Sequence, residues 1–282
     1  MAHESVEPGT LPSAVAADGT DLATASVRRK TSRTLVLALQ ILTFVALMST
    51  WQVFSATGIL DPFFFSRPSD IALRIWDWLA SGFIWVHLAT TLIEALLAFA
   101  IGTLSGVVLG LAFARVELLA AVFDPYIRIL NALPRLILAP IFLLWFGLGI
   151  ASKVALGVTL VFFVVFFNTY QGVREVDLVV LNNARMLQAT DRQLLRYVYL
   201  PSAMAWILSS MHTSIGFALV GAVVGEYMGA ARGVGYVVAQ AEGVFDTTGV
   251  FAGLILTSAV VLCIDLGIER LERYLLRWRP QQ

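Results

Sequence analysis

The chain has 282 residues, of which 59% are hydrophobic and only 13% are charged, and its mean hydropathy is +0.82. Soluble domains carry about 25% charged residues. This composition excludes an ordinary cytosolic enzyme and a disordered protein, and it indicates an integral membrane protein. The 19 basic and 19 acidic residues balance, so no net charge attracts a nucleic acid.

Residue counts exclude two further kinds of site. The single cysteine, Cys263, excludes an intramolecular disulfide and a thiolate metal site. The two lysines, Lys30 and Lys153, follow Arg29 and Ser152, so the chain has no Gly-Lys-Ser/Thr phosphate-binding loop. Any ATP hydrolysis of that type must therefore occur on another chain.

The N-terminal residues 1–33 are predicted to form a disordered cytoplasmic tail. Residues 1–27 contain few large apolar side chains, and a basic cluster, Arg28-Arg29-Lys30 with Arg33, follows them. The apolar run at 35–54 is longer than a signal-peptide core and begins late. We interpret it as the first span of a transmembrane domain that occupies residues 34–282.

A helix needs about 20 mostly apolar residues to cross a bilayer. Six segments meet this requirement, at about 35–54, 88–113, 121–147, 152–171, 203–228 and 249–268. The stretch 62–86 is too charged and too interrupted by proline to span, and its tryptophans favour a helix at the membrane interface. The expected fold is all-α, a polytopic membrane protein with about six transmembrane helices.

Basic residues are distributed unevenly among the connecting segments. With the N-terminus in the cytoplasm, the inside segments hold thirteen of the nineteen basic residues and the outside segments hold four. The other two, Arg128 and Arg135, lie within the third span. Cytoplasmic segments carry the excess of basic residues in membrane proteins, so both termini are predicted to be cytoplasmic.

The second span carries small residues at every fourth position: Ala98, Gly102, Gly106, Gly110 and Ala114. Such a stripe lets another helix approach closely. Packing inside the bundle is the favoured interpretation, and contact with another subunit is the alternative. Glu94 lies one turn earlier and should face protein or water rather than lipid.

The third span carries a polar stripe formed by Asp124, Arg128, Asn131 and Arg135. Pro134 and Pro140 should distort the helix there. A structural ion pair or snorkelling to the interface is the more ordinary explanation of the two arginines. Contact with an anionic substrate is the alternative, because intramembrane arginines are costly and often line a pathway.

The fifth span holds a polar cluster, Ser209, Ser210, His212, Thr213 and Ser214. Interhelical hydrogen bonds are the default explanation, and a polar lining for a substrate path is the alternative. Near the outer end, Glu226 is expected either to pair with Arg232 in a loop or to support an external gate. Asp265 is expected to pair with nearby arginines, and Cys263 to be buried.

The segment 172–201 interrupts the hydrophobic pattern between the fourth and fifth spans. Residues 182–197 are predicted to form one short amphipathic helix with Ala184, Leu187, Leu194 and Leu195 on its apolar side, and Leu200-Pro201 is predicted to close it. A helix too short to be stable alone is well suited to dock in a groove of a partner.

This segment, NNARMLQATDRQLLRYVYLP, resembles the EAA loop of ABC importer permeases. The resemblance covers about residues 66–280 and includes NALPRLILAP at 131–140, LLWFGLG at 143–149, Lys153, VVGEYMGAARGVGY at 223–236 and DLGIERLERYLLRWRP at 265–280. Together these motifs look like the nitrate, sulfonate and taurine branch of binding-protein-dependent permeases.

The resemblance implies a type I importer permease in a bacterial cytoplasmic membrane. Its partners would be a second permease copy, a substrate-binding protein outside the membrane, and ABC ATPase subunits that bind the ATP and magnesium, so this chain needs no cofactor. A coupling helix at about 183–195 would dock in the ATPase. The coupling residues would be Asn182, Asn183, Ala184, Arg185, Leu187, Gln188, Ala189, Leu200 and Pro201. The translocation path would include Arg128, Asn131, Arg135, Ser210, His212 and Glu226.

Three departures from the family pattern matter. Asn182 and Asn183 replace the usual Glu-Ala, Gln188 replaces a glycine, and Ser210-Met211-His212 replaces Gly-Leu-Arg. A divergent loop is compatible with a heterodimer, although a homodimer is favoured. A secondary transporter, a channel or a membrane enzyme is the alternative class. Sulfonates, taurine, nitrate, aromatic carboxylates and thiamine precursors all remain open as substrates.

Overall fold

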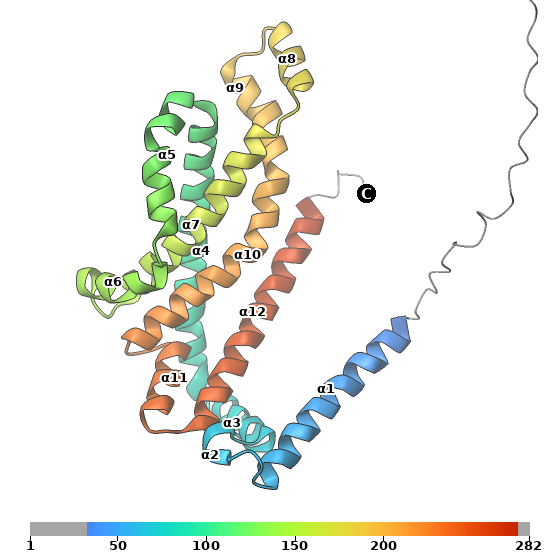
Figure 1. Ribbon diagram of the computed structural model, residues 1–282, viewed down its shortest axis with the longest axis vertical. Helices are drawn as coiled ribbons and strands as arrows, with labels where there is room; N and C mark the ends of the chain where they lie inside the picture. Colours follow the sequence, from blue (N-terminus) through green and yellow to red (C-terminus); the bar gives the residue numbers. More distant parts are fainter. Residues whose placement is uncertain (1–32, 276–282) are drawn as a thin grey trace, which may run out of the picture. The chain divides into compact units, whose positions relative to one another are not determined.

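The computed structural model describes residues 33–275, and within that range every regular element is helical. Figure 1 shows the arrangement. In chain order the elements are α1 (Arg33–Ala56), α2 (Pro62–Phe65), α3 (Pro68–Ala80), α4 (Phe83–Arg115), α5 (Glu117–Ala132), the 3-10 helix η1 (Arg135–Leu138), α6 (Ala139–Phe146), α7 (Ile150–Arg174), α8 (Leu178–Met186), α9 (Asp191–Leu194), the π-helix η2 (Leu195–Tyr199), α10 (Leu200–Met228), α11 (Val234–Gly243) and α12 (Thr247–Leu275).

Residue contacts divide the chain into two units, Met1–Leu47 and Met48–Gln282. The predicted tail, residues 1–33, lies outside the described residues except for Arg33, where α1 begins. In the first unit, the described part of α1 is an apolar helix whose side chains are exposed. The candidate sites all lie in the second unit.

The number of spans agrees with the sequence prediction. Five helical segments of the described chain are long and apolar enough to cross a membrane: Thr34–Ala56, Phe83–Arg115, Ile150–Arg174, Asp191–Met228 and Thr247–Gly267. A sixth crossing is obtained if the pair formed by α5 and the helical segment Arg135–Phe146 counts as one span, and this pair is bent by 84°. The all-α prediction of about six spans is therefore confirmed, with the third span broken.

The break in the third span follows from its prolines. Leu133 and Pro134 are extended between α5 and η1, since the residue before a proline is disfavoured in the helical region. Pro140 lies in the first turn of α6, where its missing N–H is not needed. The predicted distortion is therefore a sharp turn of the chain at 133–134.

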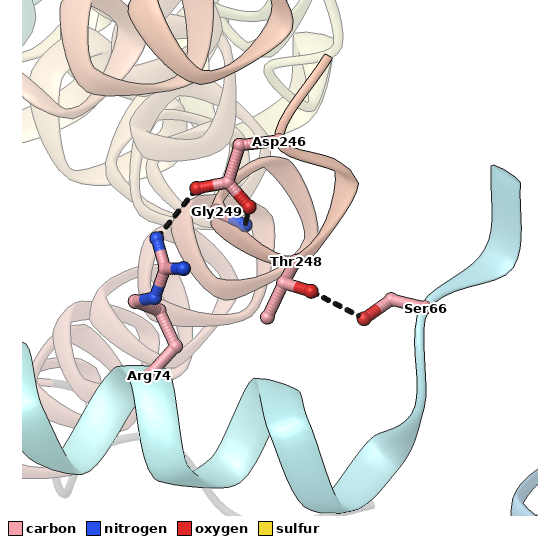
Figure 2. Close-up of polar contacts among 5 residues, drawn as sticks. All are labelled: Ser66, Arg74, Asp246, Thr248 and Gly249. Atoms are coloured by element: carbon pink, nitrogen blue, oxygen red, sulfur yellow. Dashed lines mark hydrogen bonds and ion pairs between the residues drawn. The ribbon is translucent and has the colours of Figure 1, made fainter. Parts of the chain in front are cut away.

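The stretch predicted not to span forms two short helices, α2 and α3. They pack against the start of α12, and Figure 2 shows the polar contacts. The Arg74 guanidinium lies 2.5 Å from the Asp246 carboxylate, whose other oxygen accepts a hydrogen bond from the backbone N–H of Gly249 at 3.0 Å. The hydroxyls of Ser66 and Thr248 are 2.7 Å apart. Asp246 thus caps α12 and fixes α3 to it.

The core of the second unit is the packing of α4, α7 and α10. The small-residue stripe of α4 faces α7: a Cβ added to Gly106 would lie 2.9 Å from the Phe162 carbonyl oxygen and from the Val165 Cβ. Elsewhere on α7, a Cβ on Gly221 of α10 would lie 2.4 Å from the Gly157 Cα. Backbones this close require glycine. The stripe therefore packs inside the bundle, as favoured.

The two ends of α10 carry different structures. The α8 end holds the short helices α8 and α9, and the α11 end holds the turn at 229–233 and α11; in Figure 1 they lie at the top and in the lower half of the bundle. The segment from Asp191 through η2 to Met228 forms one continuous helical run of 38 residues. A single helical rod, which bends partway along α10 in Figure 1, thus connects the two ends.

Candidate translocation path and coupling segment

The coupling segment, residues 178–190, consists of α8 and the turn that leads into α9, rather than of one amphipathic helix. Asp177 caps α8, because its carboxylate accepts a hydrogen bond from the Val179 N–H at 2.7 Å. Thr190 and Gln193 form a capping box that begins α9. The prediction of a single helix over 182–197 was wrong, since residues 187–190 form a turn between these two caps.

Gln188 explains how the turn is made. Its φ of +57° lies in the left-handed region that favours glycine. Its N–H donates to the Arg185 carbonyl at 2.9 Å, and the Ala189 N–H donates to the Ala184 carbonyl at 3.1 Å. These two bonds define a Schellman motif with Gln188 at the position after the cap. Gln188, which stands where the family has a glycine, therefore keeps the same turn at a conformational cost of about 1 kcal/mol.

The turn exposes apolar side chains. Met186 and Leu187 at the end of α8 are 81% and 84% exposed. Beneath them, a small core formed by Val176, Leu181, Leu194 and Val198 holds the two helices together. Leu187 thus lies at the tip of a hairpin of helices with its own core, and not on the apolar side of one helix together with Leu194.

The other predicted coupling residues take three kinds of position. Asn182, Asn183 and Arg185 are exposed on α8. Ala184 and Ala189 are half-buried against the small core. Leu200 and Pro201 do not close the segment, because they form the first turn of α10, directly after η2. The helical run passes through them without a break.

The polar stripe of α5 is exposed along its length. The Arg128 Nε lies 2.9 Å from the Asp124 carboxylate, and the Arg128 side chain is 76% exposed. With Glu117, Tyr170 and Arg174, this pair lines a cavity of about 440 Å³ between α4, α5 and α7. No residue of α5 is buried within the second unit. Asp124, Arg128 and Asn131 are therefore exposed in the single chain, although the first two border a cavity that is shared with α4 and α7.

Arg135 lies at the break of the third span. Its guanidinium lies 4.6 Å from the ring centroid of Phe163, near the middle of α7, and donates to Asn131 through Nη2. Its buried Nε has no hydrogen-bond partner within the described part of the chain. A donor left unsatisfied in this way has capacity for an anion. The bend also removes Arg135 from the continuous helix face predicted for it.

The polar cluster of α10 makes an interhelical hydrogen bond of the kind expected by default, at His212. Ser210 is buried and donates to the Ile207 carbonyl of its own helix at 2.7 Å. His212 bonds to Asp265 of α12 at 3.0 Å. Asp265 thus has a histidine partner on α10 that was not expected, while its pairing with the arginines near the end of the chain stays a prediction. Cys263 is exposed rather than buried.

Glu226 is part of a buried network that the sequence did not predict. Its carboxylate accepts from the Thr91 hydroxyl and from the Gly235 N–H, both at 2.7 Å, while Arg232 is exposed. Lys153, 1% exposed, donates to the carbonyls of Leu148 and Gly229, both at 2.6 Å. Glu94 is also buried within protein, as expected. The expected loop pairing of Glu226 is thus replaced by contacts with α4 and α11.

Sequence comparisons identify the family of the chain. The family described as "Binding-protein-dependent transport system inner membrane component" matches residues 102–277. A Bacillus subtilis (strain 168) protein assigned as an aliphatic sulfonates transport permease is 34% identical over 233 residues, 83% of this chain and 84% of the relative. A formylaminopyrimidine transport permease protein of Halalkalibacterium halodurans is 34% identical over 239 residues, 85% of this chain and 95% of the relative.

The fold has solved counterparts as well. A chain of the inward-facing MetNI methionine ABC transporter superposes with a TM-score of 0.55, at 21% sequence identity, over 70% of this chain and 96% of that chain. At this identity the likeness concerns the fold alone. It agrees with the type I importer fold expected from the sequence motifs.

Proposed function

This chain belongs to the family of inner membrane components of binding-protein-dependent transport systems, and on that premise we propose that it conducts a small anion along the polar face of α5. The chain is the permease of an ABC importer, a multi-pass inner membrane protein and not an enzyme. Family membership implies ATPase subunits and a substrate-binding protein as partners, and it replaces the alternatives of a secondary transporter or a channel.

The exposed α5 stripe is the observation that carries the anion proposal. Asp124, Arg128 and Asn131 lie along one side of α5 and are exposed in the single chain, and Arg135 follows at the break after the helix. Charged side chains facing hydrocarbon are costly, so such a stripe belongs beside water or protein. Arg135, with its unsatisfied Nε near the middle of α7, supplies a positive site part-way through the path. The sulfonates named for the Bacillus subtilis relative are anions of this kind.

In this proposal, a second copy of the chain covers the exposed polar side of α5. Two α5 helices facing one another across a two-fold axis would enclose a polar path and remove both stripes from lipid. The apolar side chains exposed on α6, among them Leu144 and Trp145, would add contact area. We favour a homodimer because one chain carries both kinds of surface, and a heterodimer with a related permease is the alternative.

The segment 178–190 is the proposed dock for the ATPase, which binds the ATP and magnesium. Met186 and Leu187 are exposed apolar side chains on a hairpin that is fixed by its own core, a shape suited to a groove. ATP binding would favour the outward-open state and hydrolysis would reset the permease, since a ligand shifts an equilibrium by its differential affinity for the two states. We further propose that both termini are cytoplasmic, which rests on the distribution of basic residues between the connecting segments.

Uptake by the reconstituted transporter tests the anion proposal. Proteoliposomes would contain the permease and the ATPase, with the cognate substrate-binding protein and radiolabelled ethanesulfonate added outside. We expect Arg135→Ala to reduce uptake about tenfold, the loss of one charge-assisted hydrogen bond, and Arg135→Lys to retain more activity. The ATPase should remain bound in both variants. Unchanged uptake kinetics in Arg135→Ala would remove Arg135 from the path, and uptake of formylaminopyrimidine without ethanesulfonate would contradict an anionic substrate.

A further inference from the structure

The α11 end contains a cluster of polar side chains that the proposed path does not use. Thr91 lies on α4, Lys153 on α7 and Glu226 on α10, and all three are at most 3% exposed. His87 and Glu94 of α4 are buried beside them. Burying this many polar and ionisable groups is costly unless each is bonded. The contacts that they make show what the cluster holds together.

Glu226 and Thr91 fix the start of α11. Each Glu226 oxygen has a donor, the Thr91 hydroxyl on Oε1 and the Gly235 N–H on Oε2. The Thr91 hydroxyl oxygen also accepts from the Val234 N–H at 2.8 Å. One threonine thus joins α4 to α10 through the carboxylate and to α11 through the backbone.

The Lys153 ammonium joins two turns by hydrogen bonds. Its ammonium donates to Leu148, in the turn at 147–149 between α6 and α7, and to Gly229, in the turn at 229–233 between α10 and α11. The backbone of Gly225 passes close to the Lys153 stem, where an added Cβ would lie 2.9 Å from Cγ. If one turn moved away from the other, the buried ammonium would lose one of its two acceptors.

The same helix that carries Glu226 begins at the coupling segment. The helical run Asp191–Met228 starts one residue after Thr190 and ends one residue before Gly229. Secondary-structure elements that run unbroken between two sites can carry a displacement such as a tilt from one site to the other. The contacts of Thr91, Lys153 and Glu226 lie where that tilt would reach the turns.

We propose that Thr91, Lys153 and Glu226 form a latch that makes the turns at 147–149 and 229–233 follow the rod when the coupling segment moves. The three residues are positioning residues for the transport cycle, because they act through the turns and not on the solute. The inference rests on the proposed docking role of residues 178–190. A purely structural cluster would instead stabilise the fold without conveying nucleotide-dependent movement to the turns.

Two threonines of α4 offer a matched test. Thr91→Val removes the hydroxyl that joins three helices, while Thr103→Val makes the same change at a buried hydroxyl without a hydrogen-bond partner in the described chain. A Cys263→Ser background would carry one cysteine in place of the exposed Arg232, within the turn at 229–233. The rate of maleimide labelling would be measured in the intact complex, without nucleotide and with ATP plus vanadate.

In the parent and in Thr103→Val, we expect ATP plus vanadate to change the labelling rate by about fivefold or more. This factor of about five is the lower end of the usual coupling between two sites. In Thr91→Val the ratio should fall to near one while ATP hydrolysis persists. If Thr91→Val does not assemble, Glu226→Gln takes its place, since an amide cannot accept at both positions. A nucleotide response in Thr91→Val equal to that in Thr103→Val would overturn the latch, as would no response in the parent. A failure of the proposed docking role of residues 178–190 would give a different result. In that case Leu187→Asp would keep both the bound ATPase and the nucleotide-dependent change in labelling rate.

Discussion

The two ends of the rod formed by α9, η2 and α10 are built in opposite ways. At the α11 end, polar side chains are buried and bonded: Lys153 and Glu226 are each 1% exposed and each makes two hydrogen bonds to other elements. At the α8 end, Met186 and Leu187 are apolar and project from the surface. The chain completes the α11 end by itself, whereas the α8 end presents a surface suited to a partner.

This contrast separates residues that hold the permease together from residues that connect it to its machinery. Substitutions at the α11 end should lower the free energy of unfolding of the chain. Substitutions at the tip of the α8 end should leave the fold unchanged and alter assembly with the ATPase. The contrast would be wrong if substitutions at the α11 end left stability unchanged, or if substitutions at the tip of the α8 end unfolded the chain.

Lys153→Met should have the largest effect on stability. Methionine keeps much of the aliphatic length but leaves the carbonyls of Leu148 and Gly229 without their donor, so we expect a loss of about 2–4 kcal/mol. Thermal unfolding of the purified permease in detergent would measure it as a lower midpoint. An unchanged midpoint would show that the buried ammonium contributes nothing and that the contrast between the ends is false.

Gln188→Gly should have a smaller effect of opposite sign. Glycine adopts the left-handed φ of +57° without strain, so we expect the hairpin of α8 and α9 to be stabilised by about 1 kcal/mol. Hydrogen exchange of the amides in 178–190 would detect slower local opening. Gly216→Ala in α10, at a helical position with no atom within 4 Å of the added Cβ, is a control that should leave exchange in this segment unchanged. Faster exchange in Gln188→Gly would contradict the turn described here.

His212→Ala should have the smallest effect. His212 lies between the two ends of the rod and bonds to Asp265 of α12 with partly exposed side chains. Polar contacts between membrane helices average about 0.6 kcal/mol, so the unfolding midpoint should shift little. A loss comparable to that of Lys153→Met would show that α12 is fixed to the rod by this bond rather than by packing.

The sequence predicted the fold well because hydropathy over 20 residues is a local property. All six spans were located, and Pro134 correctly marked the break in the third span. The small-residue stripe of α4 was also assigned to packing, since the spacing of Gly102, Gly106 and Gly110 directly encodes a close helix contact. Local patterns sufficed for these features.

The contacts at the two ends could not be predicted as readily. The Schellman turn at Gln188 lacks the glycine that normally marks it, so one helix was predicted where two exist. Glu226 bonds to Thr91, 135 residues away, and no local pattern encodes that contact. The sequence marks Lys153 only as a position of the family resemblance, and its two carbonyl contacts, one of them to Gly229, identify it as a structural residue.

Binding of the ATPase to the tip of the α8 end tests the central claim most directly. The measurement is the amount of ATPase that copurifies with Leu187→Asp, compared with Leu187→Met, which keeps an apolar side chain at the same 84% exposed position. The account predicts that Leu187→Asp lowers the affinity by about 30-fold, equal to a loss of about 2 kcal/mol at an interface hot spot, while the unfolding midpoint is unchanged. Equal recovery of the ATPase by both variants would contradict the account.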